Sequence, residues 1–167
     1  LKSIDINDKV IYIGSFSKSI SPSFRVSFMV LPFDLVEKYN RTFKYFICPV
    51  SIMVQKMLTT FIESGEFEKH LNRMRKIYSK KRQLLMDMLS KRKDITIRGA
   101  DAGLHVVLEY PKNYSEEYII KKAKEKKIKV YGLSSYGTKR EIPSILLGFA
   151  TLSDEKLRDG IKLLLEI

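Results

Sequence analysis

Tryptophan is absent from this sequence, histidine occurs twice, and cysteine occurs once, at Cys48. A single cysteine excludes a framework of internal disulfides and is typical of a protein that works in the reducing cytoplasm. No histidine or lysine is adjacent to Cys48. We therefore expect it to pack as a small residue rather than act as a nucleophile. Cysteine and histidine form no cluster in the sequence, so we predict no metal site.

Long apolar runs are also missing. No run approaches the roughly 20 residues that a membrane-spanning helix requires, and no charged-then-apolar leader is present. Acidic residues are scarce, with 19 Asp and Glu against 31 Lys and Arg, for a formal charge of +12. The 167 residues, 44% of them hydrophobic, can bury one sizeable core or two small ones. We therefore expect a cytoplasmic globular protein without a membrane partner.

The excess of basic charge raises the question of a nucleic-acid partner. Its densest stretch, residues 69–93, overlaps a set of apolar residues at helical spacing: Phe67, Leu71, Met74, Ile77, Leu84, Leu85 and Met88. We interpret the charges as the solvated face of a long amphipathic helix. No aromatic residue on that face offers base stacking, which favours this interpretation over a phosphate-binding stripe. A basic module that binds acidic partners is the alternative.

The segment from Gly14 to Arg25 has the strongest functional pattern. It is rich in serine and lies between two β-prone apolar runs, 10–13 and 26–31. A serine-rich loop between two buried strands supplies hydroxyl and backbone N–H donors at the end of a sheet, where α/β folds bind anionic ligands. We interpret this segment as part of a phosphate pocket.

Lys18 is the reactive candidate in this segment. It lies next to serine and seven residues before Arg25, so its amine can reach the carbonyl of a bound phosphate ester. Burial and the nearby guanidinium would both favour the neutral, nucleophilic amine. Arg25 can bind phosphate through its planar fork, and Ser15 and Ser17 complete the donor set. The alternative is one more solvated lysine, and the strand-loop-strand context favours the reactive role.

The tetrapeptide Ser-Phe-Ser-Lys at 15–18, followed by Pro22, Arg25 and the run 26–32, resembles the cofactor-lysine segment of fold-type I pyridoxal-phosphate enzymes. It is most similar to the aminotransferase-like domain of the MocR branch of GntR-type bacterial transcriptional regulators. Two C-terminal segments, 103–108 and 146–153, are similar to the same family, so the resemblance spans nearly the whole chain.

This resemblance implies the cofactor and the role of each site residue. Lys18 would form the internal aldimine with pyridoxal 5'-phosphate, and Ser15, Ser17 and Arg25 would hold the phosphate of the cofactor. It also implies a homodimer, and an amine or amino acid as the small-molecule ligand. DNA would be bound only through a winged helix-turn-helix domain that we expect upstream of Leu1, since the chain opens without an initiator methionine.

The implied fold is the C-terminal part of a fold-type I pyridoxal-phosphate aminotransferase. We expect part of the large cofactor-binding domain at 1–65, a linking long helix at 66–92 and a small α/β domain at 93–167. The patterns predict helices at 33–43, 52–63 and 66–91 and after caps at Ser115 and Ser153. They predict further strands at 95–98, 104–109, 128–131 and 145–150, with a polar loop at 133–142.

The substrate contact departs from the family pattern. Many aminotransferases place an arginine on the last strand to grip a carboxylate, and by that register this chain has Leu146 there. A leucine cannot bind a carboxylate, so recognition must come from elsewhere or the substrate differs. The replacement candidates are Arg98 and Arg140, with His105 third. His70, on the basic helix, shows no site pattern.

The residues leave three hypotheses open. The first is an effector domain of a MocR/GntR-type regulator, in which an amino-compound effector exchanges with the aldimine at Lys18. The second is a free-standing class I/II aminotransferase that acts on an amino acid. The third is the non-enzymatic basic module, whose affinity for acidic partners would fall with salt and would not depend on Lys18.

Overall fold

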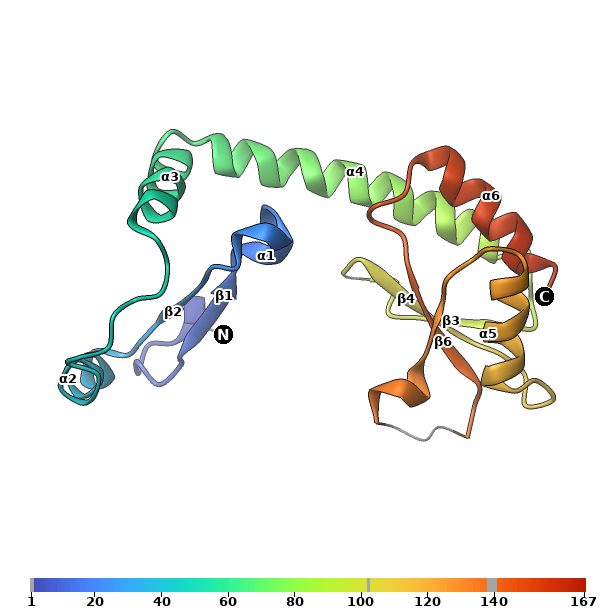
Figure 1. Ribbon diagram of the computed structural model, residues 1–167, viewed down its shortest axis with the longest axis horizontal. Helices are drawn as coiled ribbons and strands as arrows, with labels where there is room; N and C mark the ends of the chain where they lie inside the picture. The colour runs from blue at the N-terminus through green and yellow to red at the C-terminus, as the bar shows by residue number, and fades with distance from the viewer. Residues whose placement is uncertain (1, 102, 138–140) are drawn as a thin grey trace. The chain divides into compact units, whose positions relative to one another are not determined.

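The computed structural model describes residues 2–101, 103–137 and 141–167 (Figure 1). The chain divides into two compact units, Leu1–Asn72 and Arg73–Ile167. The boundary lies inside helix α4 (Glu66–Leu89), which therefore begins in one unit and ends in the other. None of the helices in the described ranges combines the length and the hydropathy of a membrane-spanning segment.

The first unit contains a two-stranded antiparallel sheet of β1 (Tyr12–Ser15) and β2 (Ser27–Val30). The sequence predicted a loop between the two strands, but this segment is not irregular. It forms a short helix α1 (Phe16–Ser19) and a 3₁₀ turn η2 (Pro22–Phe24). The strands are also mostly exposed rather than buried, because a sheet of two strands has little to pack against within this unit.

Two helices follow the sheet, α2 (Phe33–Thr42) and α3 (Ile52–Glu63), and both predicted helices are confirmed. Ser51 caps α3 as predicted, because its hydroxyl accepts the Met53 N–H at 3.3 Å. The segment between the helices is exposed, including Cys48. The expectation that Cys48 packs is therefore wrong: the neighbouring residues 41–49 are all exposed and form no core around it.

The second unit is built on a four-stranded antiparallel sheet in the order β3-β4-β6-β5. These strands are β3 (Thr96–Arg98), β4 (His105–Glu109), β5 (Tyr131–Gly132) and β6 (Ser144–Gly148). Helices α5 (Glu116–Glu125) and α6 (Asp154–Leu165) carry the predicted caps, because Ser115 accepts the Tyr118 N–H and Ser153 accepts the Lys156 N–H. The predicted loop at 133–142 contains a 3₁₀ turn η3 (Leu133–Tyr136).

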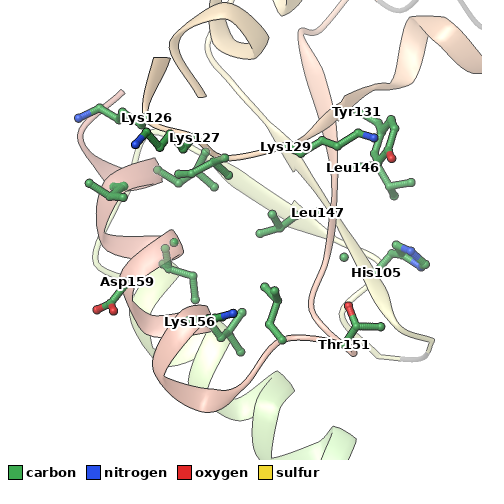
Figure 2. A pocket seen from close by; sticks show the side chains of 18 of the residues that line it. His105, Lys126, Lys127, Lys129, Tyr131, Leu146, Leu147, Thr151, Lys156 and Asp159 are labelled. Atoms are coloured by element: carbon green, nitrogen blue, oxygen red, sulfur yellow. The ribbon is translucent and has the colours of Figure 1, made fainter. Parts of the chain in front are cut away.

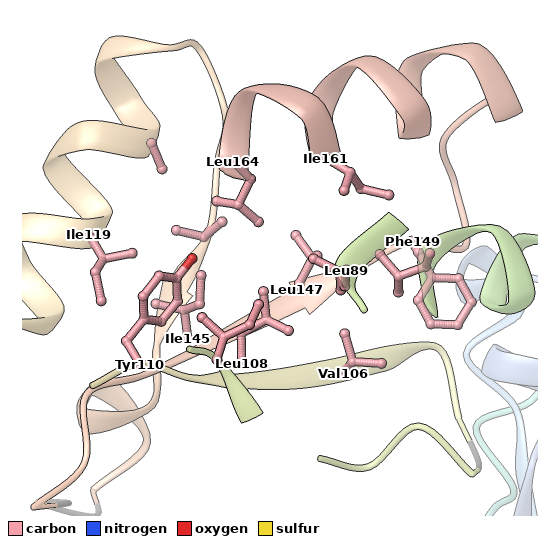
Figure 3. Close-up of a cluster of buried hydrophobic side chains, with 14 of the residues drawn as sticks. Leu89, Val106, Leu108, Tyr110, Ile119, Ile145, Leu147, Phe149, Ile161 and Leu164 are labelled. Carbon is pink, nitrogen blue, oxygen red and sulfur yellow. The ribbon is translucent and has the colours of Figure 1, made fainter. Parts of the chain in front are cut away.

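The core of the second unit lies between the sheet and the helices (Figure 3). Alternation along β4 turns Val106 and Leu108 toward the helices, where both are almost fully buried. Each covering helix contributes a buried apolar face, and the cluster includes Leu85, Leu89, Ile119, Ala123, Leu157, Ile161 and Leu164. The Lys81 amine donates to the carbonyls of Ala150 and Leu152 at 2.8 and 2.5 Å, which ties α4 to the β6–α6 connection.

Adjacent leucines on α6 provide a matched test of this core. Leu164 is 2% exposed and its neighbour Leu163 is 37% exposed. We expect Leu164→Ala to lower the free energy of unfolding by about 2–5 kcal/mol, because it leaves a cavity. Leu163→Ala should cost less than about 1 kcal/mol. Urea unfolding followed by circular dichroism measures both, and equal losses would contradict the packing described for α6.

Candidate functional site

The candidate site is the end of the β1–β2 sheet, where α1 leaves β1. Ser15 caps α1 because its hydroxyl accepts the Ser17 N–H at 3.2 Å. The Phe16 N–H donates to the Val26 carbonyl at 3.0 Å, which joins the start of α1 to the residue before β2. The helix closes with the Ile20 N–H on the Phe16 carbonyl at 2.8 Å. Lys18 therefore projects from one turn of helix held at the sheet end.

Arg25 lies at the same end of the sheet. It directly precedes Val26, the residue that accepts the Phe16 N–H. Its backbone has φ +50° and ψ +31°, the left-handed region that a non-glycine residue rarely adopts. This conformation turns the chain out of η2 and into β2, and such strain is concentrated at functional sites. The structure thus brings Ser15, Ser17, Lys18 and Arg25 to one hairpin end.

These side chains are accessible rather than enclosed. Ser15, Lys18 and Arg25 are exposed and Ser17 is half-buried. The predicted burial of the Lys18 amine is therefore wrong within the described part of the chain, because the two-stranded sheet does not cover it.

A row of rings anchors α1 to the rest of the first unit, and we call it the aromatic ladder. Successive ring centroids lie 5.2–6.2 Å apart, within the range of favourable aromatic contacts. In spatial order the ladder consists of Tyr12, Phe28, Phe16, Phe67, Phe61 and His70. It connects the sheet through α1 to α3 and to the first turns of α4.

His70 also makes a hydrogen bond to the lysine-bearing helix. Its Nε2 lies 2.9 Å from the carbonyl oxygen of Ser19, the last residue of α1. Sequence reasoning found no role for His70. The two residues are 51 positions apart, so no local spacing or periodicity could have indicated the contact.

The donors at the hairpin end fit a phosphorylated aldehyde cofactor such as pyridoxal phosphate. Among the described residues, the Ser17 hydroxyl, the Lys18 amine and the Arg25 guanidinium enter no side-chain hydrogen bond or ion pair. A guanidinium and a hydroxyl are suitable phosphate donors, and a primary amine is the group that condenses with an aldehyde.

The three candidates for a carboxylate contact have different environments. Arg98 Nε donates to the Glu109 carboxylate at 2.7 Å across β3 and β4, and Glu109 is buried. The Arg98 guanidinium therefore forms an ion pair with a carboxylate on the neighbouring strand of the same sheet. Arg140 lies outside the described residues. His105 is exposed and faces Gly148 on the neighbouring strand, where an added Cβ would lie 3.2 Å from its ring.

A separate cavity of about 650 Å³ lies within the second unit, between α6, β6 and the segment that precedes β5 (Figure 2). This volume is in the range of small-molecule pockets. Its lining combines apolar residues, among them Leu147, Leu157 and Ile161, with basic residues, among them Lys126, Lys129 and Lys156. His105 and Leu146 line it, whereas the phosphate donors predicted from sequence belong to the first unit.

Almost the whole chain matches a known protein family. The family described as aminotransferase class I and II matches residues 3–164. Among curated proteins, the uncharacterized HTH-type transcriptional regulator YdeL of Bacillus subtilis is 38% identical over 165 residues, 97% of this chain. The probable rhizopine catabolism regulatory protein MocR of Rhizobium meliloti is 27% identical over 164 residues, 96% of this chain. The chain spans 36% and 33% of these two relatives.

Solved structures give the same fold. A multiple substrate aminotransferase from Thermococcus profundus superposes with a TM-score of 0.85 at 20% identity, over 99% of this chain and 42% of that one. LysN, the α-aminoadipate aminotransferase of Thermus thermophilus, superposes with a TM-score of 0.80 at 26% identity, over 94% and 41%. That enzyme was solved with N-(5'-phosphopyridoxyl)-L-leucine bound.

Two glycines provide a matched test of the hairpin geometry. Gly14 lies opposite Phe28, and an added Cβ would collide with the Phe28 ring, whereas Gly160 on α6 has open space around that position. We expect Gly14→Ala to destabilise by about 1–3 kcal/mol through overpacking. Gly160→Ala should be neutral or stabilising by up to about 1 kcal/mol, because alanine favours the helix. Thermal unfolding measures the stability of both variants. A melting temperature of Gly14→Ala equal to that of the wild type would refute the packing of the Phe28 ring over Gly14.

Proposed function

Because this chain belongs to the aminotransferase class I and II family, we propose that it is the pyridoxal-phosphate-binding effector domain of a MocR-type transcriptional regulator. The resemblance predicted from residues 15–32, and the fold-type I aminotransferase fold that it implied, are confirmed by the family match and the structural similarity. Similarity to YdeL and MocR over nearly the whole chain supports the regulatory role. The carrying observation is the Lys18 amine, which has no partner among the described residues, on a helix fixed beside Arg25 and two serines.

Each residue at the hairpin end has a proposed task. Arg25 would bind the phosphate through its planar guanidinium, and the Ser17 hydroxyl would donate to one of the remaining phosphate oxygens. The Ser15 hydroxyl donates to the Val26 carbonyl at 3.5 Å, so it would have to exchange this bond for one to the phosphate. When bound, pyridoxal phosphate supplies an aldehyde that accepts an amine and a ring that withdraws electrons from the carbon beside that amine. Lys18 Nζ supplies the amine that attaches the cofactor. Once released, the same nitrogen can accept or donate a proton.

The regulatory role requires that a small amine or amino acid replace Lys18 at the cofactor. A ligand changes the equilibrium between two conformations only by binding one of them better. Release of the Lys18 amine would provide that difference, because α1 would then no longer be attached to the bound cofactor. We propose that a homodimer in the cytoplasm transmits this change to DNA through a domain outside this chain. The division into domains at 1–65, 66–92 and 93–167 belongs to the same proposal.

A free-standing aminotransferase is the second candidate function. The similarity to the aminotransferase LysN, at 26% identity, supports this function. Lys18 would have the same position in an enzyme and in a regulator, so the site is compatible with both. Full transfer of an amino group to an oxo acid at useful turnover would support the enzyme. Amine-dependent operator binding without turnover would support the regulator.

Lys18 can be tested directly on the full-length gene product. Protein incubated with pyridoxal phosphate, reduced with borohydride and digested should carry the label on the peptide that contains Lys18. We expect Lys18→Arg to abolish this label, because arginine keeps the charge and lacks a condensing amine. The matched control is Lys56→Arg, at an exposed lysine of the same unit. Label on other lysines, or equal label in both variants, would refute the assignment.

The role of Arg25 in phosphate binding can be tested by a substitution that removes the planar guanidinium and keeps the positive charge. We expect Arg25→Lys to weaken the binding of pyridoxal phosphate by about tenfold or more, because lysine cannot make the bidentate contact. The matched control is Arg41→Lys, at a side chain that is 76% exposed on α2. Fluorescence titration with the cofactor measures both affinities. Equal affinities would exclude Arg25 as a phosphate ligand.

A further inference from the structure

His70 contacts the lysine-bearing helix at the residue after Lys18. The final carbonyls of a helix have no partner within the helix, and Ser19 provides one of them in α1. His70 Nε2 lies 2.9 Å from this oxygen. Because a carbonyl only accepts hydrogen bonds, Nε2 must carry the proton and donate it.

The His70 ring is itself held in place. It packs against Phe61, with centroids 6.2 Å apart, and Phe61 packs against Phe67 at 5.9 Å. Phe67 in turn contacts Phe16, the first residue of α1, at 5.8 Å. The same group of rings therefore reaches α1 at its first residue through Phe16 and at its last through His70. Lys18 lies between these two anchors.

A helix of a single turn is not stable by itself in water, since nucleation fixes several residues for one hydrogen bond. The direction in which the Lys18 side chain leaves α1 therefore depends on contacts from outside the helix. We propose that His70 is a positioning residue for Lys18, holding the end of α1 so that the amine is oriented toward the cofactor. This inference rests on the proposed function of Lys18. Loss of orientation slows a reaction between groups that must meet in a defined geometry.

Three substitutions separate the donor from the ring. His70→Phe keeps an aromatic ring against Phe61 and removes the N–H. His70→Gln places an amide N–H near the position of Nε2, whereas the shorter His70→Asn places one near Nδ1. We expect the rate of borohydride-trapped labelling of Lys18 by pyridoxal phosphate to fall about tenfold in His70→Phe and His70→Asn, and to recover substantially in His70→Gln.

A second measurement reports α1 without the cofactor. The Ile20 amide closes α1 on the Phe16 carbonyl, so its hydrogen exchange follows the opening of this helix. We expect its exchange to be about tenfold faster in His70→Phe than in the wild type, and close to the wild type in His70→Gln. Denaturant unfolding of each variant separates this local change from a loss of global stability.

The outcomes distinguish this inference from the function on which it rests. Wild-type protein that is not labelled at Lys18 overturns the proposed function, and the role of His70 falls with it. If the wild type is labelled at Lys18 and His70→Phe is labelled at the same rate, only the role of His70 is overturned. Equal labelling rates in His70→Gln and His70→Asn would also overturn it, because the donor at the Nε2 position would then be irrelevant.

Discussion

The fixing of α1 at both ends is the constraint on which the candidate site depends. Four residues cannot sustain a helix by their own hydrogen bonds, so the conformation of this segment is determined by its surroundings. The Ser15 cap and the Val26 carbonyl hold its start, the aromatic ladder holds Phe16, and His70 holds the carbonyl of Ser19. The backbone of Lys18 is held in this way, while its amine makes no hydrogen bond or ion pair among the described residues.

The two units have different physical characters. In the second, three helices cover one face of an antiparallel sheet, and the apolar residues of both layers meet in one buried cluster. In the first, Val26 and Leu58 are buried, while large apolar side chains such as Phe33 and Met53 are 87% and 79% exposed. Contiguous apolar surface of this kind marks contact sites in native proteins.

The basic side chains that are available to bind a ligand are those without an ion-pair partner in the described part of the chain. Arg98 is paired with the buried Glu109, so its guanidinium stabilises the sheet. Arg25 and Lys18 have no such partner among the described residues and lie at one end of the hairpin. The left-handed backbone of Arg25 is consistent with a position held for function, since arginine gains no conformational benefit there.

Local sequence signals determined much of this protein. Ser51, Ser115 and Ser153 marked the starts of their helices, because a hydroxyl cap acts on N–H groups two or three residues away. The Ser-Phe-Ser-Lys tetrapeptide with its flanks, and the two C-terminal segments 103–108 and 146–153, carried the resemblance to the family, which the match over residues 3–164 confirms. Apolar spacing likewise predicted the long helix, which ends at Leu89, close to the expected residue 91.

Only the tertiary structure decided which distant groups meet and which are left exposed. The His70–Ser19 hydrogen bond, the Arg98–Glu109 pair and the Phe28 ring over Gly14 each join residues on different elements. Strand pairing and helix packing create these contacts, and no periodicity along the chain encodes them. The exposure of Lys18 and Cys48 was mispredicted for the same reason, since burial depends on what other segments cover a residue.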